Sequence, residues 1–179
     1  INTKVKLFGG FDFQTMNSTP SWPVVEELKK QYEVVQISAE QPITEEVDGL
    51  LAVLPSSLSQ EEMDHLQNYI EAGNPTLLLI DPLPVVDISL APMEKAGSQQ
   101  NPFMQQRGPQ PKPKGNINKF MSDLGVRWNK GSISWDAYNP HPDLSQIQPE
   151  IIFVGAGSKN PSAFNQENHA SSGLQELVL

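Results

Sequence analysis

The clearest pattern of apolar and polar positions lies between residues 48 and 84. Residues 50–54 and 76–80 are short apolar runs, long enough for strands and too short for helices. Between these runs, apolar residues recur at helical spacing at Met63, Leu66 and Ile70. Two strands joined by one helix form a βαβ unit, in which the strands are parallel and helices cover both faces of the sheet. The pattern therefore predicts an α/β fold.

The predicted helix of this unit has signals at both of its ends. Ser59 stands three residues before Glu62, which is the spacing of a capping box. Leu58 and Met63 occupy the positions of a hydrophobic staple around that cap. Gly73 suits the left-handed backbone conformation that ends many helices. These signals predict a helix that begins just after Ser59 and ends just before Gly73.

Strands and helices alternate along much of the remaining chain. The order is strand, helix, strand, a link, and then a second strand–helix–strand unit, which is typical of a doubly wound sheet. We therefore expect an α/β fold with three layers and a doubly wound, mostly parallel sheet, of the flavodoxin-like or amidotransferase-like type. The further predicted elements are strands over residues 5–8, 32–37, 126–128, 151–154 and 177–179, and helices over residues 22–30 and 116–124.

Composition limits the class of protein. The chain has 179 residues, which suits one domain spanning residues 1–179. Its formal net charge is −9 and its basic residues are scattered, whereas a nucleic-acid surface needs clustered Lys and Arg. We therefore expect no nucleic-acid partner. The absence of cysteine excludes disulfides, zinc–thiolate sites and cysteine nucleophiles.

The ends of the chain and its hydropathy suggest a piece of a larger protein. No stretch approaches the roughly 18 consecutive apolar residues of a transmembrane helix. The first residues do not form the basic and apolar regions of a signal peptide. The last residues lie inside an apolar run that predicts a strand. We therefore expect a soluble fragment of a longer protein.

Residues 91–115 differ from the rest of the chain in composition. They are rich in Pro, Gln and Gly and show neither helical nor strand periodicity. Such a segment cannot bury enough apolar surface to offset the entropy cost of ordering it. We expect a disordered loop here; a loop that orders on a partner is the alternative.

The residues that support catalysis in other α/β proteins form no recognisable pattern here. His65, His141 and His169 lie far apart and share no metal-ligand spacing. Ser56 and Ser57 follow a predicted strand and precede a helix, where a nucleophile elbow would lie, but the glycines of G-x-S-x-G are absent. We therefore expect no catalytic residue, no cofactor and no metal site.

Small and acidic residues are predicted at the carboxyl ends of the strands, where open α/β sheets bind ligands. A glycine pair there allows a ligand to approach the backbone closely, and two carboxylates near one crevice suit a cation or an amine. Asp81 followed by Pro82 is also typical of a turn that ends a strand. The candidate crevice for a ligand or partner comprises Gly9, Gly10, Asp12, Pro55, Ser56 and Asp81.

Several segments, in their order and spacing, resemble the auxiliary domain of gliding-motility-type ABC transporters, the GldG-like family. Together they span most of the chain, and residues 91–115 are unmatched. The segments are WPVVEELKKQYEVVQIS at residues 22–38, the strand–helix–strand unit with its LSQEE capping box at residues 48–84, LGVRWNKGS at residues 124–132 and NHASSGLQELVL at residues 168–179.

The resemblance implies a non-enzymatic binding or scaffold domain of an ABC-transporter auxiliary subunit. It also implies a periplasmic, extracytoplasmic location, tethering to the inner membrane by helices outside this chain, and other transporter subunits as partners. A peptide or small-molecule ligand is a further expectation. Two alternatives stay open: an α/β hydrolase or amidotransferase-like enzyme, and a sugar- or peptide-binding module that uses Trp135 and Tyr138.

Overall fold

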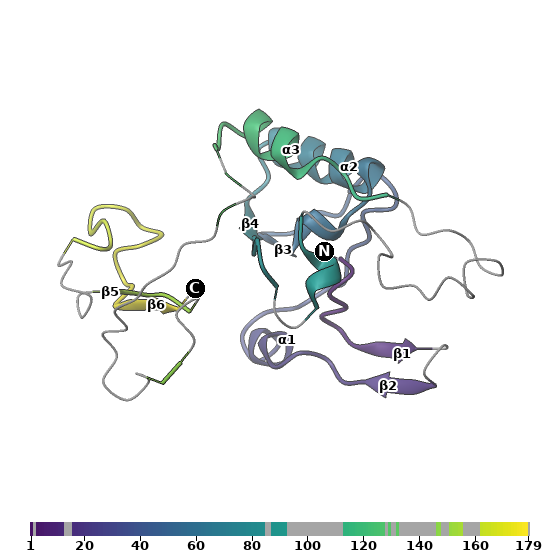
Figure 1. Cartoon of the computed structure of the whole chain (residues 1–179), viewed down its shortest axis with the longest axis horizontal. Helices are drawn as coiled ribbons and strands as arrows, with labels where there is room; N and C mark the ends of the chain where they lie inside the picture. Colours follow the sequence, from purple (N-terminus) through teal and green to yellow (C-terminus); the bar gives the residue numbers. More distant parts are fainter. Residues whose placement is uncertain are drawn as a thin grey trace. The chain divides into compact units, whose positions relative to one another are not determined.

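The structure, a computed structural model, is shown in Figure 1. It describes residues 1, 3–12, 16–84, 87–92, 113–127, 129, 132, 146–147, 151–155 and 162–178. The chain divides into two compact units, residues 1–131 and 132–179. The elements are β1 (Gly10–Asp12), β2 (Asn17–Thr19), α1 (Pro23–Leu28), β3 (Leu50–Val53), the 3-10 helix η1 (Pro55–Ser57), α2 (Gln60–Glu71), β4 (Thr76–Leu79), the 3-10 helix η2 (Ile88–Leu90), α3 (Ile117–Asp123), β5 (Phe153–Gly155) and β6 (Glu176–Val178).

The start of α2 confirms the predicted capping box. The Ser59 hydroxyl accepts a hydrogen bond from the Glu62 backbone N–H at 3.4 Å. The Glu62 carboxylate in turn accepts one from the Ser59 backbone N–H at 2.7 Å. Leu58 and Met63, the two staple residues, are both buried. The first turn of α2 therefore satisfies its free N–H groups through its own sequence.

The end of α2 is also where the sequence predicts it. Gly73 has a φ of +92° and donates a hydrogen bond to the Ile70 carbonyl at 2.9 Å. The side-chain amide of Asn74 donates to the Tyr69 carbonyl at 2.9 Å, so that a second carbonyl of the last turn is satisfied. The left-handed helix end predicted from Gly73 is confirmed.

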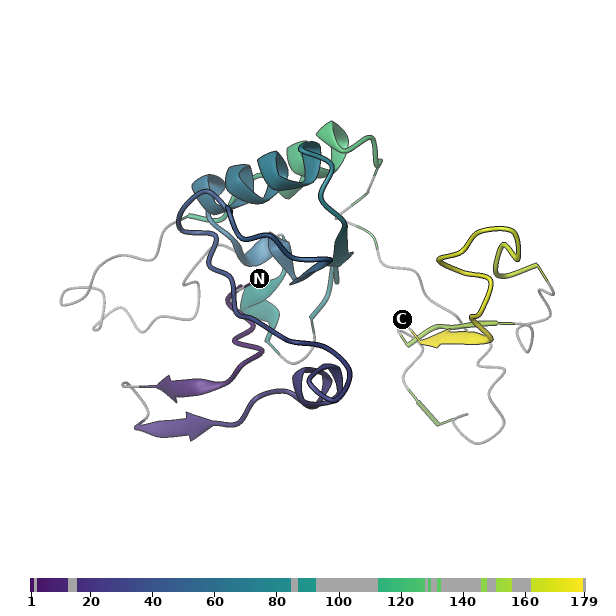
Figure 2. The ribbon, with the colours of Figure 1, turned by 180° about the vertical axis from the view of Figure 1, so that it is seen from behind.

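The predicted βαβ unit is confirmed as well. β3 and β4 pair in parallel, with Leu50 opposite Thr76 and Val53 opposite Leu79. α2 connects them, and it lies beside α3 on one side of the two strands (Figures 1 and 2). The hydrophobic core of the first unit forms between these elements and comprises Ile1, Ile37, Ala39, Leu50, Ala52, Leu58, Met63, Leu66, Tyr69, Ile117, Phe120 and Met121.

The predicted helices over residues 22–30 and 116–124 correspond to α1 and α3. In α1, Val25 is buried while Val24 is exposed. In α3, the Asn116 side chain caps the first turn by accepting from the Lys119 N–H at 3.1 Å. Both helices are short, and each turns only one narrow face to the interior.

The prediction of a three-layer, doubly wound, mostly parallel sheet is wrong. The strands of the described residues form three separate two-stranded sheets. Only β3–β4 is parallel, whereas β1–β2 and β5–β6 are antiparallel. The fold is a small mixed α/β arrangement, and its parallel part does not extend beyond the βαβ unit.

The N-terminal segment explains why the parallel sheet stops at β3. The Ile1 amino group donates to the Leu51 carbonyl at 2.6 Å, and the Thr3 hydroxyl donates to the Val53 carbonyl at 2.7 Å. These bonds occupy carbonyls that a further strand beside β3 would need. The predicted strand over residues 5–8 is instead a turn, in which Lys6 has a φ of +53°.

The other predicted strands depart from the expectation in different ways. Residues 32–37 form no strand, and the apolar side chains of Tyr32 and Val35 are exposed. Val126 and Arg127 lie outside any strand. The strand predicted over residues 151–154 exists as β5, and the final apolar run as β6, but the two pair antiparallel with each other. An apolar run thus formed a strand only where a partner strand was available.

Some predictions fall outside the described residues. These are most of the loop over residues 91–115, namely residues 93–112, and also Trp128, Trp135, Tyr138 and His141. The expected disordered loop and the expected single domain over residues 1–179 therefore stay predictions.

Candidate functional site

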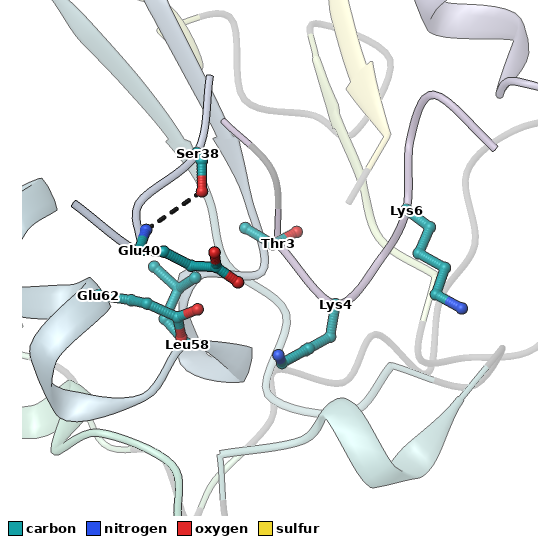
Figure 3. Close-up of a pocket in the computed structure, with 7 residues that line it drawn as sticks. All are labelled: Thr3, Lys4, Lys6, Ser38, Glu40, Leu58 and Glu62. Atoms are coloured by element: carbon teal, nitrogen blue, oxygen red, sulfur yellow. Dashed lines mark hydrogen bonds between the residues drawn. The ribbon is translucent and has the colours of Figure 1, made fainter. Parts of the chain in front are cut away.

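A small open cavity lies beside the N-terminal segment of the first unit (Figure 3). Its volume is about 170 Å³. Three stretches of the chain that are distant in sequence form its walls. The lining residues are Thr3, Lys4, Lys6, Ser38, Glu40, Leu58 and Glu62.

Hydrogen bonds between backbone and side chains hold these walls in place. The Lys4 backbone N–H donates to the Ser57 hydroxyl at 3.2 Å, and this hydroxyl donates to the Leu54 carbonyl at 2.8 Å. The Ser38 hydroxyl accepts from the Glu40 N–H at 3.2 Å, as Figure 3 shows. The N-terminal segment is therefore fastened to the turn that follows β3, and the floor of the cavity is the capped start of α2.

The cavity carries charges of both signs. Lys4 and Lys6 bring ammonium groups, and Glu40 and Glu62 bring carboxylates. Within the described residues, no ion pair joins Lys4, Lys6 or Glu40 to an opposite charge. The Glu62 carboxylate is already engaged in the capping box of α2. Lys4 and Glu40 are thus the charged side chains best placed to meet a bound ion or zwitterion.

The sequence alone did not predict this cavity. Lys4 and Lys6 lie in a turn, and Ser38 and Glu40 lie in an irregular link. None of them belongs to a motif or to a periodic pattern. Only the pairing of the N-terminal segment with the turn after β3 brings them near the start of α2, so no local signal was available.

Part of the predicted crevice lies in the N-terminal hairpin. Gly10 and Asp12 belong to β1, and Gly9 precedes it. A Cβ atom on Gly9 would lie 2.2 Å from the Thr19 carbonyl oxygen, and the φ of Gly9 is +70°. Glycine is therefore required at position 9 by the close approach of the chain's own backbone.

The other part lies at the carboxyl ends of β3 and β4. Pro55 and Ser56 begin the turn after β3 and are buried. Asp81 follows β4, where its carboxylate accepts from the Leu83 N–H at 2.7 Å and so forms a strand-ending turn. Pro55, Ser56 and Asp81 thus follow the ends of neighbouring strands, whereas Gly10 and Asp12 belong to a separate sheet and Gly9 precedes it. Neither of the two cavities described here is lined by these residues, and the crevice stays a prediction.

The serines of the elbow-like turn are engaged in structural hydrogen bonds. Ser56 is buried, and its hydroxyl donates to the Leu90 carbonyl at 3.4 Å. The Ser57 hydroxyl is bonded to the backbone of Lys4 and Leu54. Leu54, which precedes the turn, has a φ of +51° and a ψ of +59°. Leu54 itself adopts this strained, left-handed backbone conformation, and its side chain is not reactive.

A second cavity of about 170 Å³ lies along α2. His65 is one of its lining residues, and its Nδ1 atom lies 2.8 Å from the Ala39 carbonyl oxygen. This contact fastens the link before β3 to the helix. In the part of the chain that the structure describes, no three His, Cys, Asp or Glu side chains gather closely enough to hold a metal ion.

None of the helices in the described ranges has the length and apolar character needed to cross a membrane. No curated protein and no solved structure matches the chain significantly. A family model does match: the family of auxiliary components described as an ABC-type uncharacterized transport system covers residues 6–179, nearly the whole chain. The chain therefore belongs to this family and is an auxiliary component of an ABC-type transport system.

Proposed function

We propose that the chain is a non-catalytic binding or scaffold domain of a GldG-like auxiliary subunit, located outside the cytoplasm. The family match over residues 6–179 is the observation that carries this proposal. An auxiliary component acts beside the subunits that hydrolyse ATP and form the translocation path, so its natural partners are those subunits. The periplasmic location and the tether to the inner membrane are parts of the same proposal, and they rest on the resemblance of the sequence to GldG-like proteins.

The geometry of the described residues supports action by contact. Nucleophilic catalysis requires a nucleophile and a base within hydrogen-bond distance, near donors that stabilise an oxyanion. Ser56 and Ser57 are buried and bonded to backbone carbonyls. His65, on α2, bonds the Ala39 carbonyl. These groups maintain the turns of the first unit, which is a structural use of residue types that also occur in active sites.

The proposed assembly is tested by co-purification. The full-length protein, tagged and extracted from its native membrane, is expected to co-purify with the ATPase and permease subunits of one ABC transporter. A cysteine introduced at the exposed position Tyr32 is expected to react with a membrane-impermeant maleimide in intact cells. Purification without transporter subunits, or labelling only after lysis, would contradict the proposal.

The non-catalytic role is tested on the purified complex. Ser56→Ala removes the hydroxyl of the elbow-like turn while changing little in volume, and Ser18→Ala, at an exposed position of β2, is a matched control. We expect both variants to support the same rate of ATP hydrolysis by the transporter. A selective loss of transporter function in a folded and assembled Ser56→Ala protein would favour the hydrolase alternative.

A small zwitterionic ligand is a second candidate function, favoured by Lys4 and Glu40 of the first cavity, which form no ion pair with the described residues. At about 170 Å³ the cavity is smaller than the roughly 300–1,000 Å³ of drug-sized ligand sites, so a free amino acid or a peptide terminus is the class that fits. Titration calorimetry with glycine and diglycine tests it. Lys4→Gln and Glu40→Gln are expected to abolish the binding heat, whereas Lys30→Gln, in an exposed pair on α1, is expected to preserve it. No binding heat with the unmodified protein would exclude this class.

A further inference from the structure

Among the described residues, no segment pairs with the outer edge of β4. Leu50 N–H donates to the Pro75 carbonyl at 2.9 Å, and Leu54 N–H donates to the Leu79 carbonyl at 2.8 Å. In a parallel pair with this register, the odd-numbered residues of β4 direct their backbone groups toward β3. The backbone groups of the even-numbered residues point the other way. Nothing within the described ranges pairs with the outward groups of Thr76, Leu78 and Ile80.

One face of the β3–β4 sheet is open as well. Leu78 and Ile80 pack against the hydrophobic core. Leu77 and Leu79 point to the opposite face and are 60% and 45% exposed, respectively. The sequence pattern predicts strands that are buried on both faces. The exposure of these two leucines therefore differs from that prediction. The unpaired edge and the exposed apolar face therefore belong to the same strand, β4.

The described residues give this edge none of the features that keep edge strands apart. Such strands carry lysines, prolines or bulges, or are covered by another segment. β4 reads TLLL over Thr76–Leu79, without charge, proline or bulge. The chemistry that this edge recognises is that of another extended strand, which supplies backbone donors and acceptors at the same spacing.

We propose that the occupant of this edge is a second copy of the chain, paired antiparallel through β4 about a two-fold axis at Leu78. In this register the outward-directed even-numbered residues face each other: Leu78 is opposite Leu78 of the second copy, and Thr76 is opposite Ile80 of the second copy. Leu77 is opposite Leu79 of the second copy, at a Cα separation of about 4.5 Å. Leu77 of each copy thus lies opposite Leu79 of the other copy, and both leucine pairs lie on the same face of the joined sheet.

The self-complementary spacing favours a second copy over an unrelated strand. Two exposed leucines two residues apart, on either side of an inward-facing residue, match themselves when the strand is turned by 180°. The flanking charge is compatible, because Asp81 falls opposite Pro75 of the second copy and not opposite another acid. The pairing joins two two-stranded sheets into one, and sheets of more than two strands are more stable.

The dimer is expected to be weak and sensitive to salt. A single strand pair buries less than the roughly 1,200–2,000 Å² of a stable interface, so association should occur at micromolar concentrations or above. Each copy carries a net charge of −9, and the repulsion between copies is screened by added salt. Dimerisation should therefore strengthen as the ionic strength rises. This inference does not depend on the proposed function.

Sedimentation velocity of the chain between about 10 µM and 1 mM tests the inference. We expect reversible dimers whose dissociation constant falls as salt is added. Leu77→Lys with Leu79→Lys places Lys opposite Lys and should weaken the dimer by at least about tenfold. Leu77→Lys with Leu79→Glu places Lys opposite Glu in the proposed register and should retain the dimer.

Val24→Lys with Val35→Lys is the matched control, because it adds the same charge at valines that are 43% and 49% exposed elsewhere. Its dimerisation should stay within about threefold of that of the unchanged chain, and circular dichroism verifies that all variants are folded. A chain that stays monomeric up to about 1 mM overturns the proposal. So does a Lys/Lys variant that dimerises as tightly as the control, or a Lys/Glu variant as weak as the Lys/Lys one.

Discussion

The side chain of Tyr69 has two opposite effects on the stability of the core. Its ring belongs to the hydrophobic core, but its hydroxyl is buried and has no hydrogen-bond partner among the described residues. A buried polar group without a partner loses its hydrogen bonds to water and gains nothing in return. Tyr69 is therefore stabilising through its ring and destabilising through its oxygen.

Tyr69→Phe is expected to leave the free energy of unfolding unchanged or to raise it by about 1 kcal/mol, because the substitution removes only the unpartnered hydroxyl. Urea denaturation measures the change. Tyr32→Phe is the control, since Tyr32 is exposed and should respond by less than about 0.5 kcal/mol. A loss of about 1 kcal/mol or more in Tyr69→Phe would mean that the hydroxyl has a partner in solution.

Gly73 matters for its backbone conformation alone. Its φ is +92°, and a Cβ atom there would meet no other atom within 4 Å. Gly73→Ala should therefore destabilise the protein by about 1 kcal/mol, which is the cost of a left-handed conformation for a residue with a Cβ atom.

Gly49→Ala is the matched control for this change. The space around Gly49 is equally open, and its φ lies outside the left-handed region. Urea denaturation should show little change or a slight gain in stability for Gly49→Ala. Equal effects at the two glycines would show that α2 ends in another way.

Helix α2 is the element on which the first unit depends. It connects the parallel strands, supplies core residues and carries its own cap. Its boundaries are set by bonds between residues no more than five apart in sequence. Its packing partner α3 comes from a distant part of the chain, and the Gln67 amide donates to the Asp123 carboxylate at 3.2 Å to link the two helices.

Ser59→Ala should destabilise the protein by about 1 kcal/mol, because it leaves an N–H group of the first turn without its acceptor. Ser59→Thr keeps a hydroxyl acceptor and should cost less than the alanine substitution. Thermal and urea denaturation of the two variants provide the comparison. If alanine and threonine were equivalent, the capping bond would contribute nothing measurable.

The Lys119–Asp123 pair on α3 should make stability depend on pH. Hydrogen bonds from Lys119, and then from Gln67, lower the pKa of the Asp123 carboxyl below its usual value. A carboxyl with a lowered pKa in the folded state stabilises that state above its unfolded pKa, and the contribution is lost as the pH falls through the folded pKa. Asp123→Asn should therefore lower the Tm slightly near pH 7 and leave it unchanged once the pH lies below the lowered pKa of Asp123 in the folded state.

The salt dependence of that difference provides a further check. Because the pair is exposed, added salt should reduce the effect of Asp123→Asn at pH 7. Lys119→Gln removes the other partner and should reproduce both the small loss and its disappearance in acid. A difference that persists in acid would show that Asp123 acts through packing.

The chain as a whole consists of two units with unequal cores. Among the described residues, the hydrophobic core cluster lies within residues 1–131, whereas Phe153 is a buried apolar residue of the second unit. In the described part of the second unit, the paired strands are β5 and β6, and each contributes only three residues. The first unit should therefore account for most of the cooperative unfolding.

A chain that ends at Gly131 should keep the helical circular dichroism signal of the full chain, because α1, α2 and α3 all lie before that point. Its midpoint of urea denaturation should stay within about 0.5 M of that of the full chain, which corresponds to roughly 1 kcal/mol for a domain of this size. Loss of cooperative unfolding in the shortened chain would contradict the division into two units.

The sequence predicted the parts of the fold that neighbouring residues determine. The β3–α2–β4 unit, the Ser59–Glu62 capping box, the end of α2 at Gly73 and helix α3 are all in place. Each depends on periodicity or on bonds within one or two helical turns, and such signals are present in any short window of the chain. The family resemblance likewise agreed with the matched family at the level of an auxiliary component of an ABC-type transport system, whereas the GldG-like assignment stays a proposal.

The extent of the sheet and the candidate cavity depended on contacts between distant segments. Ile1 and Thr3 bond to carbonyls of β3, fifty residues away in sequence, and no local pattern announces such bonds. The same docking of the N-terminal segment brings Lys4 to the cavity that also contains Glu40. An apolar run indicates that a strand is favourable, but it does not specify which strand lies beside it. Pairing is decided by which segment reaches the free edge and satisfies its backbone groups, and this is a property of the folded chain.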